Sequence, residues 1–107
     1  WIPEYGSSDD PKQFDYIHAY SPYHNVVDGG EYPATLYISG DGDTRVAPLH
    51  ARKMAALMQA KNGSMNPILL RYHTQAGHSG GQPVRQQVDD MVDMVSFLLW
   101  QVGFQEQ

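Results

Sequence analysis

Two short apolar runs, each followed by a glycine-containing loop and then a helix-like segment, constrain the fold of this chain more than any other feature. The runs are residues 33–39 and 67–72, and their Ile, Leu and Tyr content is typical of buried parallel strands. The loops that follow are 40–46 and 74–82. An order of strand, loop, helix, repeated twice, predicts an α/β fold with a parallel sheet and with both loops at the carboxyl ends of the strands.

Proline residues mark where the helices begin. Pro11, Pro48 and Pro83 each stand where a first helical turn is expected, a position that needs no N–H donor. Residues 1–8 are expected to form a loop. The three predicted helices cover residues 10–20, 48–62 and 83–103, and the last keeps a 3.6-residue apolar period.

Two parallel strands cannot form a complete sheet, because an uncovered edge would be left unpaired. We therefore expect neighbouring strands from another part of a longer polypeptide. The start at Trp1, where no methionine stands, is consistent with that expectation. We also expect the 107 residues not to fold on their own.

Composition excludes several classes of protein. A formal net charge of −5 with seven Lys and Arg gives no basic surface for nucleic acid. The absence of cysteine excludes disulfides and thiolate chemistry. The apolar stretch at 91–100 is interrupted by Asp93 and falls short of the roughly 20 residues that span a bilayer. We expect a soluble protein, cytoplasmic or periplasmic, without a membrane or nucleic-acid partner.

Asp43 follows the first strand and His78 follows the second, so a parallel sheet would bring both to one end. A histidine takes the proton of a serine hydroxyl, and a carboxylate fixes and stabilises that histidine. In α/β-hydrolases the chain order is Ser, Asp, His, and the last two occur here in that order. The alternative is a carboxylate that caps a turn and an exposed loop histidine.

Four segments resemble the prolyl oligopeptidase family of serine peptidases, which has an α/β-hydrolase catalytic domain. Residues 40–50, Gly-Asp-Gly-Asp-Thr-Arg-Val-Ala-Pro-Leu-His, are similar to the family's catalytic aspartate segment. Residues 76–83, Ala-Gly-His-Ser-Gly-Gly-Gln-Pro, are similar to its catalytic histidine loop. Residues 20–26 and 1–6 also resemble stretches of the family, so the matches span nearly the whole chain in order.

The resemblance implies that Asp43 and His78 are the triad aspartate and histidine. Asp41 is the competing carboxylate, and Asp43 is preferred because the family's aspartate lies two positions before the arginine matched by Arg45. Ser79 adjoins the histidine but lacks the Gly-x-Ser-x-Gly surroundings of a nucleophile, so we interpret it as a loop serine.

The resemblance also implies a substrate pocket. Arg45 matches an arginine that binds a substrate carbonyl, although a surface ion pair is its simplest interpretation. Trp1 matches an indole that stacks on the substrate proline, and Tyr5 and Val46 match other pocket walls. Without the family, the aromatic residues would be assigned to the core.

The remaining polar residues include two departures from the family pattern and several candidates for other sites. The family commonly has an acidic residue where Thr44 stands and a glycine where Ser79 stands. We expect these two departures to affect substrate preference more than reaction class. We expect no cofactor and no metal, because the remaining histidines show no ligand spacing. Asp89 and Asp93 are expected to form a solvated helix face.

We therefore expect residues 1–107 to be the C-terminal segment of an α/β-hydrolase peptidase domain. It would supply the Asp and His of a serine endopeptidase that cleaves short peptides after proline. Its partner would be the remainder of the same enzyme, which contains the nucleophile elbow and a propeller domain. The alternatives are a related serine peptidase or esterase with another pocket, or a non-catalytic interaction module.

Overall fold

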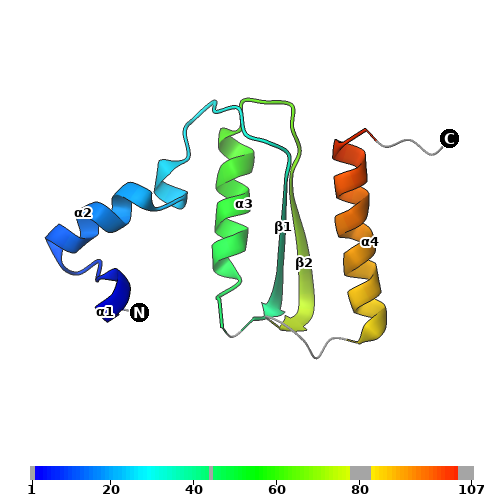
Figure 1. Cartoon of the computed structure of the whole chain (residues 1–107), viewed down its shortest axis with the longest axis horizontal. Coiled ribbons are helices and arrows are strands. Elements are labelled where there is room, and N and C mark those ends of the chain that lie inside the picture. The colour runs from blue at the N-terminus through cyan, green and yellow to red at the C-terminus, as the bar shows by residue number, and fades with distance from the viewer. Residues whose placement is uncertain (1, 44, 78–82, 104–107) are drawn as a thin grey trace.

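The computed structural model describes residues 2–43, 45–77 and 83–103 of the chain (Figure 1). The elements follow one another as α1 (Ile2–Tyr5), α2 (Pro11–Tyr20), the 3-10 turn η1 (Tyr23–Asn25), β1 (Thr35–Gly42), α3 (Leu49–Lys61), β2 (Ile68–Gly77) and α4 (Val84–Gln101). The α/β class and the three long helices predicted from the sequence are confirmed. No helix in this described part is long and apolar enough to cross a membrane.

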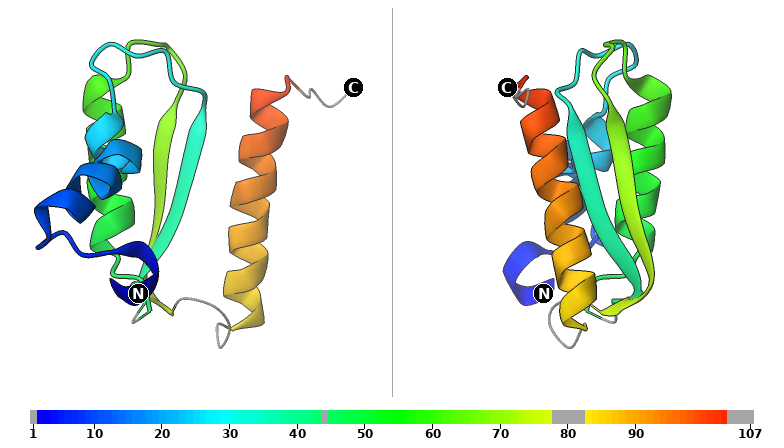
Figure 2. Two further views of the ribbon diagram at one scale, coloured as in Figure 1. Left: turned by 60° about the vertical axis from the view of Figure 1, so that its left-hand side comes forward. Right: turned by 90° about the vertical axis from the view of Figure 1, so that its right-hand side faces the viewer.

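The strands β1 and β2 pair in parallel and form the middle layer, with α3 on one face and α4 on the other (Figures 1 and 2). Thr35 pairs with Ile68 at one end and Gly42 pairs with Gly77 at the other. Both strands are longer than predicted, because β1 continues to Gly42 and β2 to Gly77, with the pairs Gly40–His73 and Gly42–Gly77 beyond the predicted strand ends. Backbone pairing needs no apolar side chains, so glycine and polar residues extend the strands past their apolar centres.

The ladder is irregular near its carboxyl end. Gly40 pairs with His73, yet Gly42 pairs with Gly77, so two steps along β1 correspond to four along β2. Such an irregularity bends the longer strand and changes the direction of the residues that follow. The extra length of β2 lies directly before the segment that carries His78.

The α3 face of the sheet holds the buried core. Ala55 and Met58 of α3 and Ile68 of β2 are the hydrophobic residues buried in the described part of the chain, at 2%, 6% and 6% exposure. The side-chain amide of Gln59 also donates to the Ile68 carbonyl at 2.8 Å. The crossover helix is therefore fastened to β2 by both packing and a hydrogen bond.

The α4 face is open by comparison. A cavity of about 680 Å³ lies between the sheet and α4, with apolar lining from Leu36, Leu69, Phe97 and Trp100. Trp100 is 59% exposed and Leu69 is 41% exposed. Apolar surface that faces a cavity of this size has lost little contact with water, so this layer contributes little burial.

The amino-terminal arm departs from the expected loop at residues 1–8. Ile2–Tyr5 forms one helical turn, closed by a hydrogen bond from the Gly6 N–H to the Ile2 carbonyl at 2.9 Å. Gly6 has φ of +94°, which ends the turn in a conformation that favours glycine. Asp10 then caps α2 through bonds from two backbone N–H groups, as its position before Pro11 predicts.

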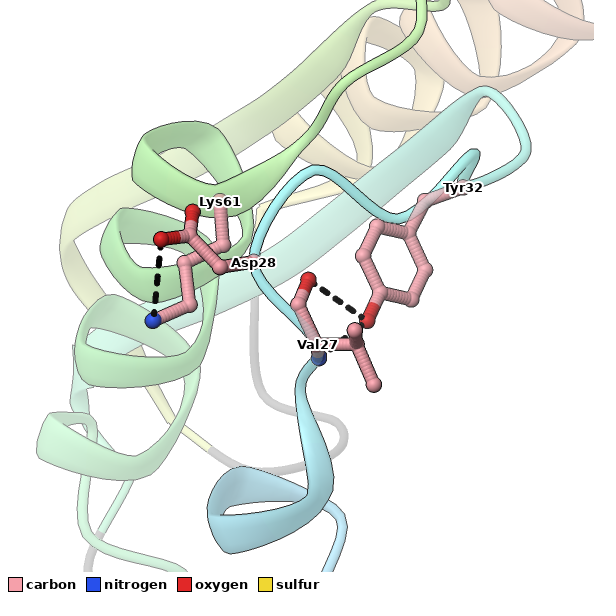
Figure 3. Close-up of polar contacts among 4 residues, drawn as sticks. All are labelled: Val27, Asp28, Tyr32 and Lys61. Carbon is pink, nitrogen blue, oxygen red and sulfur yellow. Dashed lines mark hydrogen bonds and ion pairs between the residues drawn. The ribbon is translucent and has the colours of Figure 1, made fainter.

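The connection from the arm to the sheet is anchored on the end of α3 (Figure 3). Lys61 forms an ion pair with Asp28 at 3.9 Å, and the Val27 N–H donates to the Tyr32 hydroxyl at 2.6 Å. Gly63 approaches the Gly29 carbonyl so closely that a Cβ would lie 2.3 Å from its oxygen. These contacts fix the entry into β1.

Candidate active site at the carboxyl ends of the strands

The register of the two strands places their last residues side by side. Gly42 ends β1 and pairs with Gly77, which ends β2. Asp43 is the next residue after Gly42, and its N–H donates to the Gly40 carbonyl at 3.2 Å. His78 is the next residue after Gly77 in the sequence and lies outside the described residues, as does Trp1. The two predicted triad residues thus follow directly after a pair of matched positions.

The Asp43 carboxylate organises its own turn. Its Oδ1 accepts hydrogen bonds from the Arg45 N–H at 3.0 Å and the Val46 N–H at 2.8 Å. The turn-capping alternative from the sequence is therefore observed. It does not compete with a catalytic role, because a carboxylate has about four acceptor sites. The two bonds instead orient the half-buried carboxylate relative to the strand end.

Asp41, the competing carboxylate, contacts Tyr72 of β2, which in turn meets α3. The Tyr72 hydroxyl donates to Asp41 Oδ1, and the Arg52 guanidinium lies 5.6 Å from the centre of the Tyr72 ring. The hydrogen bond to Asp41 is the main cause of a raised Tyr72 pKa, with a smaller contribution from burial. Asp41 is therefore engaged in joining β1, β2 and α3.

The described residues of the predicted substrate pocket are exposed. Arg45 and Val46 share the turn with Asp43, so the structure brings these three together. Tyr5, 51% exposed, comes from α1, which lies level with the carboxyl ends of the strands in Figures 1 and 2. The core alternative given for the aromatic residues does not hold for Tyr5, and Val46 is likewise 46% exposed.

A second polar cluster joins β2 to α4 and was not predicted. His73 Nε2 lies 2.5 Å from Asp90 Oδ1, and Arg71 Nε lies 2.7 Å from Asp93 Oδ2. Asp93 keeps 48% exposure, as expected of a solvated face, while it also forms an ion pair with Arg71. A signal was present: Arg71 and His73 share one face of a strand, and Asp90 and Asp93 are three apart on a helix.

Metal binding has no support among the residues that are described. No group of three or more His, Cys, Asp or Glu side chains in that part of the chain lies close enough to hold an ion. The chemistry available at the strand ends is that of a carboxylate, an arginine and apolar walls.

The parallel sheet, the crossover helix and the acidic turn at the strand end define a part of an α/β-hydrolase. Comparison with known proteins agrees: the sequence matches the prolyl oligopeptidase family over residues 1–105. The chain belongs to the prolyl oligopeptidase family. The family membership expected from the four sequence segments is confirmed.

Individual relatives give the same assignment. The prolyl endopeptidase of Elizabethkingia miricola is 43% identical over 104 residues, which cover 96% of this chain and 15% of the relative. Prolyl oligopeptidase A of Amanita bisporigera is 36% identical, over 96% of this chain and 14% of the relative. The chain therefore spans about one seventh of the length of these relatives.

Solved structures share the fold. A structure from a study of two prolyl endopeptidases has a TM-score of 0.90 at 44% identity, covering 98% of this chain and 16% of that one. Prolyl oligopeptidase B from Galerina marginata, bound to a 35mer hydrolysis and macrocyclization substrate, has a TM-score of 0.90 at 36% identity. That match covers 100% of this chain and 15% of the other.

Proposed function

We propose that this chain supplies the aspartate and histidine of a Ser-Asp-His triad, as Asp43 and His78, in a serine endopeptidase that cleaves short peptides after proline. The observation that carries the proposal is the pairing of Gly42 with Gly77, because each proposed triad residue directly follows one member of that pair. The family assignment supports the reaction class.

In the proposed reaction, a serine from another part of the polypeptide attacks the peptide carbonyl. His78 takes the serine proton and later gives it to the leaving amine. Asp43 accepts a hydrogen bond from the imidazole, fixes its tautomer and stabilises the imidazolium. The backbone bonds from Arg45 and Val46 to Oδ1 would hold the carboxylate in place for this task, so that Oδ2 can meet His78.

We propose that specificity comes from Arg45, Val46, Tyr5 and Trp1. The guanidinium of Arg45 would bind a substrate main-chain carbonyl, for which its planar set of donors is suited. Trp1 would stack on the proline ring, with Tyr5 and Val46 as further walls. Support comes from the exposure of Tyr5, Arg45 and Val46 at the strand ends, where they can reach a ligand.

The remainder of the same enzyme is the proposed partner of this chain. The relatives are about seven times longer, and residues 1–107 would be the C-terminal segment of their peptidase domain. The nucleophile elbow and a propeller domain would lie elsewhere in the polypeptide. The two-stranded sheet and the open cavity beneath α4 support this, because both need further elements to cover them.

Substituting His78→Ala in the complete polypeptide tests the proposal. We expect kcat for a prolyl peptide to fall by at least about 10⁴-fold and labelling by a fluorophosphonate to be lost, because the serine would no longer be activated. His50→Ala, at an exposed position of α3, is the matched control and should stay within about two-fold. Retention of activity by the His78→Ala enzyme would refute the assignment.

A further inference from the structure

We propose that Asp90 of α4 is a positioning residue for the segment that carries His78, acting through His73 of β2. This inference rests on the proposed function, because it concerns the placement of the proposed general base. Asp90 would hold the start of α4 against the end of β2. It would thereby fix the distance between the two ends of the segment 78–83.

The contact between His73 and Asp90 is close and shielded from water. His73 Nε2 and Asp90 Oδ1 are 2.5 Å apart, and both atoms are buried. The side chains retain only 10% and 21% exposure. The contact has the distance of an ion pair but not the geometry of a hydrogen bond. Because solvent cannot reach either atom, each group has the other as its polar neighbour.

The surrounding charges favour this arrangement. Arg71, two residues before His73 on the same strand face, lies 2.7 Å from Asp93 and 3.9 Å from Asp90. Asp93 is one helical turn after Asp90, so two carboxylates of α4 meet two cationic or hydrogen-bonding groups of β2. On β1, the residue paired with His73 is Gly40, which has no charge, and the next, Asp41, bonds to Tyr72.

The position of the contact links it to the proposed site. His73 lies four residues before Gly77, where β2 ends, and Asp90 lies within the second turn of α4, which begins at Val84. Six residues of chain, 78–83, join those two elements. The α4 face is otherwise open, with a cavity of about 680 Å³ beneath the helix. Among the described residues, the ion pairs of Arg71 and His73 connect β2 to α4 beside this cavity.

The test compares Asp90→Ala with Asp89→Ala in the complete polypeptide. Both substitutions remove one carboxylate and place the same helix-favouring residue at adjacent positions of α4, and Asp89 is exposed. For Asp90→Ala we expect kcat to fall about ten-fold or more, with KM within about two-fold, because misplaced catalytic groups slow the chemical step. Asp89→Ala should leave both within about two-fold.

Asp90→Asn is an intermediate change, because it removes the charge but keeps an oxygen that can face His73. Its kcat should lie between those of Asp90→Ala and Asp89→Ala. Backbone hydrogen exchange supplies a readout independent of activity. Amides of residues 74–77 and 84–88 should exchange about ten-fold faster in Asp90→Ala than in Asp89→Ala.

Equal kcat and equal exchange in the Asp90→Ala and Asp89→Ala enzymes would overturn the positioning role. That result together with an inactive His78→Ala enzyme would refute this inference alone. An active His78→Ala enzyme would refute the proposed function itself, so the two failures can be told apart.

Discussion

The two faces of the sheet are built differently. Against α3, the apolar side chains of Ala55, Met58 and Ile68 are almost fully buried. Against α4, apolar side chains such as Leu69 remain substantially exposed around a cavity, and the contacts are ion pairs from Arg71 and His73 to the helix. One face is packed and the other is held by charges at its edge.

The comparison of the two faces shows which part of the fold is formed by residues that are close in sequence. The unit of β1, α3 and β2 is continuous in sequence and buries its own core, as expected of a crossover connection. The radius of gyration of 17.0 Å exceeds the roughly 13 Å typical of a compact domain of this length. We infer that the α4 face acquires its core from elsewhere in the enzyme.

The largest expected effect concerns the two carboxylates at the end of β1. Asp41 belongs to the packed α3 face through Tyr72, whereas Asp43 lies beyond the strand. Asp43→Asn should lower kcat about 10⁴-fold in the complete polypeptide, because the imidazole would lose its orienting carboxylate. Asp41→Asn should lower kcat by less than about ten-fold. Steady-state kinetics on one prolyl peptide measure kcat for both variants. A larger loss of kcat for Asp41→Asn than for Asp43→Asn would contradict the assignment of Asp43.

The free energy of unfolding tests how much the buried core on the α3 face contributes to stability. Met58→Ala removes a side chain that is 6% exposed, and we expect the free energy of unfolding to fall by about 2–5 kcal/mol. Met65, 100% exposed, offers the same substitution without burial and should change stability by less than about 0.5 kcal/mol. Urea unfolding of both variants measures these changes in the free energy of unfolding. Similar losses for the two would mean that α3 does not hold the core.

The smallest expected effect is at the edge of the α4 face. The Arg71–Asp93 pair is short, but its side chains are 38% and 48% exposed. Asp93→Asn should therefore lower the free energy of unfolding by at most about 1 kcal/mol. Added salt should reduce this difference from the wild type. Asp89→Asn is the charge-matched control. A loss as large as that of Met58→Ala would show that charges, not packing, dominate the fold.

Much of the fold could be predicted because local signals agree with it. Prolines 11, 48 and 83 mark helix starts, and the apolar runs mark the strand centres. The strand ends were misplaced, because the pairs Gly40–His73 and Gly42–Gly77 leave no apolar pattern in the sequence. The helical turn at Ile2–Tyr5 likewise has no periodicity to reveal it.

The site was predictable in part for the same reason. Asp43 follows a recognisable strand and lies in a family motif, so its location at the strand end could be inferred. The contact of Asp41 with Tyr72 depends on strand register, which sequence patterns do not give to the nearest residue. The His73–Asp90 contact depends on how α4 lies across the sheet, and a single charged pair far apart in sequence does not specify that.

The most direct test of the central claim is the distance between Asp43 and His78 in an experimental structure of the complete enzyme. We expect a hydrogen bond of about 2.6–3.2 Å from His78 Nδ1 to the Asp43 carboxylate, with Nε2 facing a serine hydroxyl. A His78 imidazole bonded to Asp41, or separated from both carboxylates, would contradict it.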